Sequence, residues 1–135
     1  MSPNGVVIDA CVLIKASVRD TLIRAYGAGL YRLHWTDDIL VEVERNLIAN
    51  DMTSTTGAQQ LIATLRSVLA EAQVFDYQAL IPSLTNHLKD RHVLAAAVVA
   101  NARIIVTENV RDFPANAVGM HGIDVQRTDE FLVDL

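Results

Sequence analysis

Hydrophobic residues follow two different spacings along the chain. Short runs that are mostly apolar and β-branched, "GVVID" at 5–9 and "RIIVT" at 103–107, predict buried strands. Longer segments repeat apolar residues at intervals of three and four, which predicts amphipathic helices. The segments with helical spacing are 17–29, 36–50, 53–72 and 90–102, and two further strands are expected at 30–35 and, at a sheet edge, 122–126.

The ends and faces of these segments sharpen the prediction. Thr36 or Asp37 is placed to cap the helix 36–50. Its apolar stripe is expected to comprise Ile39, Leu40, Val43 and Leu47, and that of the helix 53–72 to comprise Leu61, Leu65, Val68 and Leu69. The segment 90–102 is apolar on nearly all sides, which is typical of a helix inside a domain. Residues 73–77 are compatible with one more short strand, and 76–86 show no clear period.

Strands separated by helices indicate parallel pairing, because parallel neighbours need a crossover connection. The expected fold class is therefore α/β, a three-layer α/β/α sandwich with a mainly parallel central sheet. A chain of 135 residues can bury one substantial core, so residues 1–135 are interpreted as a single domain. The last residues, "DEFLVDL", have the pattern of the beginning of a longer helix.

Composition narrows the classes of function. With 51% hydrophobic and 20% charged residues the chain is an ordinary globular sequence. Its single cysteine allows no internal disulfide, so we expect a reducing compartment, the cytoplasm. No apolar run is long enough to span a bilayer, and we expect no membrane partner. The net charge of −5 means that any nucleic acid must be held by local features.

Several acidic residues fall where the predicted strands end. Asp9 ends the first strand, Glu108 and Asp112 follow the strand 103–107, Asp90 opens the helix 90–102, and Glu42 lies about one turn into the helix 36–50. Sites in parallel α/β sheets form at the carboxyl ends of the strands. These carboxylates, though distant in sequence, are therefore candidates to meet at one edge.

Structural roles compete with this interpretation. Asp90 is placed to act as a helix N-cap, Asp112 to begin a turn before a proline, and Glu42 to be a solvated helix residue. Asp9 is harder to explain in this way, because a carboxylate that ends an apolar strand is costly to bury without a cation or donors. Taken together, the acids favour a hard cation such as Mg²⁺ or Mn²⁺, and no Cys and His set supports zinc.

Four segments of the chain resemble a known family. "VVIDACVLI" at 6–14, "ILVEVERNL" at 39–47, "DRHVLAAAVVANARIIVTENVRDFP" at 90–114 and "GIDVQRTDEFL" at 122–132 are similar to PIN-domain nucleases, most of all to the bacterial VapC-like toxins. The resemblance implies a metal-dependent endoribonuclease, and its acidic positions match Asp9, Glu42, Asp90 and Asp112. Asn109 stands where many PIN domains have an aspartate, so it offers only a neutral carbonyl and leaves the number of metal ions open.

The residues suggest a division of roles. Asp9, Asp90 and Asp112 are the candidate metal ligands, and Glu42 and Asp112 are candidates to orient water for in-line attack on phosphorus, giving 5′-phosphate and 3′-hydroxyl ends. Thr107 and Asn109 are candidate supporting residues. Arg91, Arg111 and His92 are candidates for contacts with RNA phosphates, each with surface solvation as the alternative, whereas Cys11 is assigned to packing.

The resemblance also implies partners. They are an RNA substrate and an antitoxin protein that covers the helices between 39 and 70, although a homodimer could use the same surface. Two other functions stay open: a catalytically weak PIN-fold binding module, favoured by Asn109, and a stand-alone RNA-processing nuclease. A phosphatase of the haloacid dehalogenase kind is disfavoured, because its second aspartate would fall at Cys11.

Overall fold

The computed structural model describes residues 3–135. Its centre is a sheet of four parallel strands in the order β2-β1-β3-β4. Their bounds are β1 (Gly5–Ile8), β2 (Arg32–His34), β3 (Ile104–Val106) and β4 (Asp124–Gln126). The predicted parallel sheet is confirmed, and so is the edge position of the last strand.

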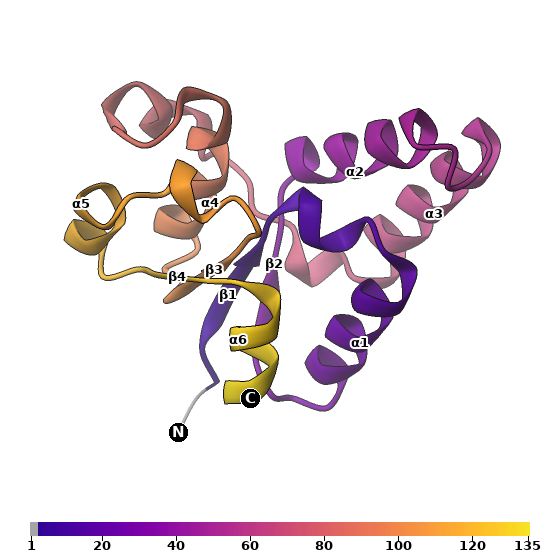
Figure 1. The fold of residues 1–135 in the computed structure, drawn as a ribbon, viewed down its shortest axis with the longest axis horizontal. Helices are drawn as coiled ribbons and strands as arrows, with labels where there is room; N and C mark the ends of the chain where they lie inside the picture. The colour runs from indigo at the N-terminus through magenta and orange to yellow at the C-terminus, as the bar shows by residue number, and fades with distance from the viewer. Residues whose placement is uncertain (1–2) are drawn as a thin grey trace.

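The helices form two layers around this sheet. Figure 1 shows the strands between α4 and α5 on one side and α1, α2 and α3 on the other, which confirms the α/β/α sandwich. The helix bounds are α1 (Ala16–Gly27), α2 (Asp37–Ala49), α3 (Thr55–Val68), α4 (Arg91–Val99), α5 (Ala115–Val118) and α6 (Thr128–Asp134). Short 3-10 turns link them at Ala10–Leu13, Ala70–Ala72, Gln78–Ser83, Leu88–Asp90, Val110–Asp112 and Gly119–His121.

The innermost strand and helix make the core. Val6, Val7 and Ile8 of β1 have no exposed surface, because β1 is paired on both edges and covered on both faces. α4 packs on β1 and β3, and the whole stretch from Val93 to Ala97 is buried. Its alanines let the helix backbone approach the sheet closely. Asp90, the N-cap residue of this helix, is thereby brought to the carboxyl end of the central strands.

Caps and apolar faces largely agree with the sequence. The Thr36 hydroxyl accepts a hydrogen bond from the backbone N–H of Ile39 (3.1 Å) and begins α2. The four residues predicted for the buried stripe of α2 are those that the structure buries. In α3 the prediction is wrong for Val68, which is 73% exposed, and the buried face is formed by Ala58, Ile62 and Leu65.

Several boundaries differ from the sequence prediction. β1 ends at Ile8, and Asp9 is the N-cap of the following 3-10 turn, although its backbone N–H still bonds to Val106 (3.0 Å). Residues 73–77 form no strand beyond a single bridge between Gln73 and Trp35. α4 ends at Val99, because the chain turns through a left-handed residue at Asn101 (φ 55°). Within residues 3–135, the helices are all too short or too polar to cross a membrane.

Candidate active site

The acidic residues from distant segments meet in one cavity of about 480 Å³ at the carboxyl ends of β1 and β3. It is bounded by 3-10 turns, one of which leads directly into α4, and by one face of α2. Its lining residues are Asp9, Cys11, Ile14, Glu42, Asn46, Asn50, Lys89, Asp90, Asn109 and Asp112. The structure thus brings together four of the five acids singled out from the sequence, Asp9, Glu42, Asp90 and Asp112, and leaves out Glu108.

Asp9 is buried and firmly oriented. One carboxylate oxygen accepts the backbone N–H of Ala10 (2.8 Å), and the other accepts the Thr107 hydroxyl (2.8 Å). Burial raises the pKa of Asp9 above its usual value, and the nearby Glu42 charge adds to this, although the two hydrogen bonds oppose it. Two donors thus fix the direction of this carboxylate without neutralising it.

Asp90 is the most perturbed acid of the cavity. Its side chain is 4% exposed, and it makes no capping hydrogen bond to α4, so the structural role considered for it is not realised. Burial, then the adjoining Asp112 carboxyl and then the charge of Asp9, raise its pKa to about 7. One of its oxygens, Oδ2, is buried without a hydrogen-bond partner. Unless a proton or a cation joins them, Asp90 and Asp112 repel each other.

His87 approaches the same pair of acids. Ligand atoms of His87, Asp90 and Asp112 all lie within 4.8 Å of one another. The backbone explains this closeness, because the N–H of His87 donates to the carbonyl of Asp112 (3.1 Å) and the Asp90 N–H to that of His87 (2.9 Å). His87 was not predicted from the sequence, where its only signal is its position three residues before Asp90. Asp9 and Glu42 line the cavity without joining this compact group.

Glu42 is paired with a histidine. Its Oε1 lies 2.9 Å from Nε2 of His92, across the gap between α2 and α4. Burial lowers the pKa of His92, but the hydrogen bond to Glu42 and its charge outweigh this and raise the pKa overall. Asn46 and Asn50, at successive four-residue steps along α2, extend the polar face that begins at Glu42. His92 therefore orients an acid and does not face outward as a separate phosphate contact.

Thr107 connects several parts of the site. Its hydroxyl has no exposed surface, donates to Asp9 and accepts the backbone N–H of Asn109 (3.0 Å). Asn109 lines the cavity, so its amide oxygen is a possible neutral ligand there. Cys11 lies beside Asp9, with its sulfur 3.8 Å from Oδ2, and burial raises the pKa of its thiol. The neutral thiol acts as a wall of the cavity.

The basic residues expected to contact RNA are placed differently. Arg91 donates through Nε to the carbonyl of Asn86 (2.9 Å), and Arg111 is exposed, and neither lines the acidic cavity. Lys89 does line it, and the sequence analysis missed it because an isolated lysine before Asp90 carries no pattern. Glu108 points elsewhere, since its carboxylate accepts hydrogen bonds from the backbone N–H (3.0 Å) and the hydroxyl (2.8 Å) of Thr128, the first residue of α6.

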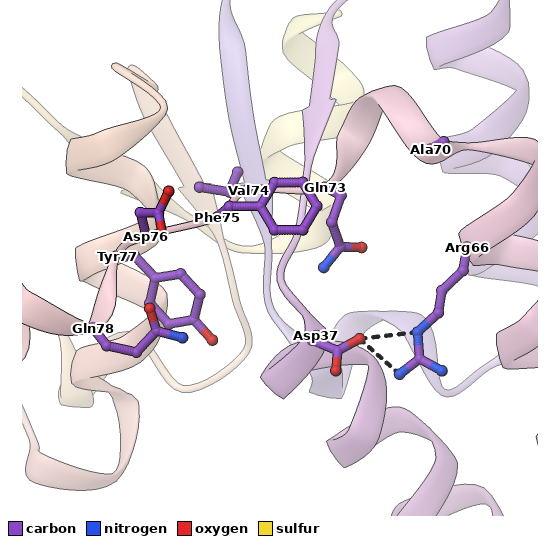
Figure 2. A pocket seen from close by; sticks show the side chains of 9 residues that line it. All are labelled: Asp37, Arg66, Ala70, Gln73, Val74, Phe75, Asp76, Tyr77 and Gln78. Carbon is purple, nitrogen blue, oxygen red and sulfur yellow. Dashed lines mark hydrogen bonds and ion pairs between the residues drawn. The ribbon is translucent and has the colours of Figure 1, made fainter.

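A second hollow of about 550 Å³ lies beside α2 and α3 (Figure 2). Asp37 there is paired with Arg66 (2.7 Å), and Phe75 is one of the lining residues. The Tyr77 hydroxyl donates to Asp38 nearby. The Asp37 carboxylate is paired with Arg66 and the hollow holds none of the predicted site acids, so chemistry is better supported by the acidic cavity.

The donor set of the acidic cavity fits a hard divalent cation. Its candidate ligands are carboxylate oxygens, an amide oxygen and the neighbouring imidazole, and Oδ2 of Asp90 is buried without a hydrogen-bond partner. Magnesium and manganese accept such oxygen-rich sites.

Comparison with known proteins agrees with this geometry. A family model described as "PIN domain" matches residues 5–111. A curated protein of Mycobacterium tuberculosis (strain ATCC 25618 / H37Rv), named "Putative ribonuclease VapC50", is 47% identical over 66 residues, which are 49% of this chain and 39% of that protein. The matched segment thus spans less than half the length of this relative. Since the family model covers most of the 135 residues of this chain, the chain belongs to the PIN domain family.

Proposed function

We propose that the chain is a Mg²⁺- or Mn²⁺-dependent endoribonuclease that hydrolyses RNA phosphodiester bonds. The observation that carries the proposal is the buried, unpartnered oxygen of Asp90 in a cavity with three more carboxylates, Asp9, Glu42 and Asp112. Such an arrangement is stabilised by a divalent cation. The relative named as a ribonuclease supports RNA as the substrate.

Each acid has its own task in this proposal. Asp90 and Asp112 hold the cation together with Asp9, and His87 is close enough to complete their side of the site. A divalent metal here would supply Lewis-acid chemistry, lowering the pKa of water and offsetting the charge on phosphate. Glu42, oriented by His92, accepts a proton from the attacking water, and Lys89 offers a positive charge for the RNA backbone.

The test is cleavage of labelled single-stranded RNA by protein freed of metal and then titrated with Mg²⁺ or Mn²⁺. We expect cleavage only with metal, and a loss of more than about a hundredfold in Asp9→Asn, since a metal ligand is removed while the side-chain shape is kept. Asp134→Asn, an exposed acid outside the cavity, is the matched control and should cleave as the parent does. Equal cleavage by all three proteins would refute the proposal.

The proposed biological role is that of the toxin of a toxin–antitoxin pair. The VapC-like segments support this role, and so do exposed apolar side chains near α2 and α3: Val41 (38% exposed), Val68 (73%) and Phe75 (67%). A protein that covers them could send an arginine into the acidic cavity, where it would pair with carboxylates in place of the metal.

This role predicts inhibition that competes with metal. Co-purification with the product of the neighbouring gene, followed by cleavage assays at rising Mg²⁺, tests it. Relief of inhibition by metal, and loss of inhibition on replacing the inserted arginine with alanine, support the toxin role. Symmetric self-association through the same residues, without any such partner, would favour a stand-alone RNA-processing nuclease that forms a homodimer.

A weak or inactive binding module is the second candidate, favoured by Asn109. This side chain lines the cavity but brings no charge. Asn109→Asp adds a carboxylate at the position where many PIN domains carry one, so it should strengthen Mn²⁺ binding measured by calorimetry. A parent that binds RNA but cleaves none at saturating Mn²⁺, together with a cleaving Asn109→Asp variant, would establish this second function.

A further inference from the structure

Another hollow, distinct from the one shown in Figure 2, adjoins the acidic cavity. It has a volume of about 610 Å³ and lies between the 3-10 turn Ala10–Leu13, α1 and α6. Cys11 and Ile14 line both spaces, so only a wall of side chains separates this hollow from the four acids. A molecule bound over Asp9 would therefore extend directly into it.

The two spaces differ in chemical character. The acidic cavity holds four carboxylates against one lysine, Lys89, whereas the hollow has mainly apolar walls that include Val18 of α1 and Leu132 of α6. Its acids are already engaged: Glu108 accepts two hydrogen bonds from Thr128, and Asp129 accepts the backbone N–H of Glu130. The space favours an uncharged, largely apolar group.

Two cations border the hollow. Lys15 is exposed and takes part in none of the ion pairs found among residues 3–135. Arg127 donates to the backbone carbonyl of Glu108 (3.1 Å) and forms a long ion pair with the carboxylate of the same residue (4.0 Å), and its side chain remains half exposed. Both can contact a phosphate that lies beside an uncharged group inserted in the hollow. Such local positive charge is what a protein of net negative charge needs to hold RNA.

We propose that this hollow is a nucleobase subsite that receives the base of a nucleotide next to the scissile phosphate, with Lys15 on the adjoining phosphate. This proposal rests on the proposed nuclease function. It assigns to the hollow the selection of the position at which the RNA is cleaved. Val18 and Leu132 are then specificity-determining residues, because they line the space on which the base would pack.

The experiment uses a short single-stranded RNA and derivatives in which one nucleotide at a time lacks its base. Cleavage in Mg²⁺ and binding in EDTA, followed by fluorescence anisotropy, are measured for each RNA. For the parent we expect removal of one particular base beside the cleaved bond to lower kcat/KM and affinity by about tenfold. Removal of bases farther away should have little effect.

Filling the hollow should remove this discrimination. In Val18→Phe, and independently in Leu132→Phe from the opposite wall, the intact RNA should bind and react about as poorly as the derivative lacking the critical base. Thr21→Phe, which adds the same ring at an exposed position of α1, should keep the parent profile. Lys15→Gln should weaken all RNAs equally and reduce the salt dependence of binding by about one phosphate contact.

The outcomes separate this inference from the nuclease proposal. A parent that cleaves no RNA with metal contradicts the nuclease function, and the binding measurements in EDTA then still decide on the subsite. A parent whose affinity is equal for every derivative, or phenylalanine variants that fold as judged by thermal melting and keep the parent profile, would overturn the subsite.

Discussion

Asp90→Asn should stabilise the metal-free protein while destroying its response to metal. The side chain is buried beside Asp112, and its pKa is raised to about 7 from an ordinary 3.8. Above pH 7 the Asp90 carboxylate of the folded protein therefore carries a negative charge, which burial and the neighbouring carboxylates disfavour. The asparagine has nearly the same shape, carries no charge and can donate to Asp112.

The magnitude follows from the pKa shift. At 1.36 kcal/mol for each pK unit, relief of the whole shift sets an upper limit of about 4 kcal/mol at pH 8. Solvent screening in the cavity and the closeness of Asp112 reduce this upper limit. We therefore expect Asp90→Asn to raise the free energy of unfolding by about 2 kcal/mol. A chain of 135 residues has an unfolding entropy of about 0.28 kcal/mol/K, so the gain in Tm is about 7 °C.

The pH dependence has a definite sign. Between about pH 4 and 7 the folded parent keeps a proton on Asp90 that the unfolded chain has lost, so parent stability falls as pH rises through this window. The advantage of Asp90→Asn should therefore be absent near pH 4 and complete at pH 8.

Thermal melting in EDTA and in Mn²⁺ tests both effects. In EDTA at pH 8 the variant should melt about 7 °C above the parent. Mn²⁺ should raise the Tm of the parent and leave the variant nearly unchanged, because ligand binding stabilises only a folded state that binds it. The control Asp134→Asn removes an equal charge from an exposed position and should follow the parent. A variant less stable than the parent in EDTA at pH 8 would refute the reasoning.

Two further predictions concern the residues that orient the acids. Thr107→Val leaves Asp9 without one of its two donors, so it should cost about 1–3 kcal/mol and weaken Mn²⁺ binding, whereas Thr107→Ser should restore both in calorimetry and melting. The ring of His92 should titrate above the usual 6.5 by NMR in the parent and return toward it in Glu42→Gln, and an unchanged pKa would contradict the proposed pairing.

Much of the fold was predictable from the sequence because local patterns agree with burial. β1 and β3 are apolar on both faces, and α4 is apolar nearly all round, which is expected of elements at the centre of a three-layer sandwich. Val68 and residues 73–77 were predicted wrongly, because propensity and spacing do not say which apolar residues a neighbouring element covers. Irregular connections such as the 3-10 turns have no period to detect.

The positions of the four acids in the candidate site could be predicted from the sequence, whereas most of its other residues could not. Asp9, Glu42, Asp90 and Asp112 are placed by strand ends and helix starts, so topology alone brings them together. The contacts of Arg91, His92 and Glu108 depend on side-chain directions across elements, which spacing does not encode. Lys89 and His87 lie in an irregular loop, and only the backbone bonds of that loop bring them to the site.

The central claim is that these carboxylates hold a divalent metal ion. The most direct measurement is anomalous diffraction from crystals of the protein soaked in Mn²⁺. The account predicts a manganese peak within coordination distance, about 2.0–2.6 Å, of Asp90 and of at least one of Asp9 and Asp112, which disappears in Asp90→Asn crystals. A cavity that stays free of manganese at saturating concentration, or a peak that persists unchanged without the Asp90 carboxylate, would contradict it.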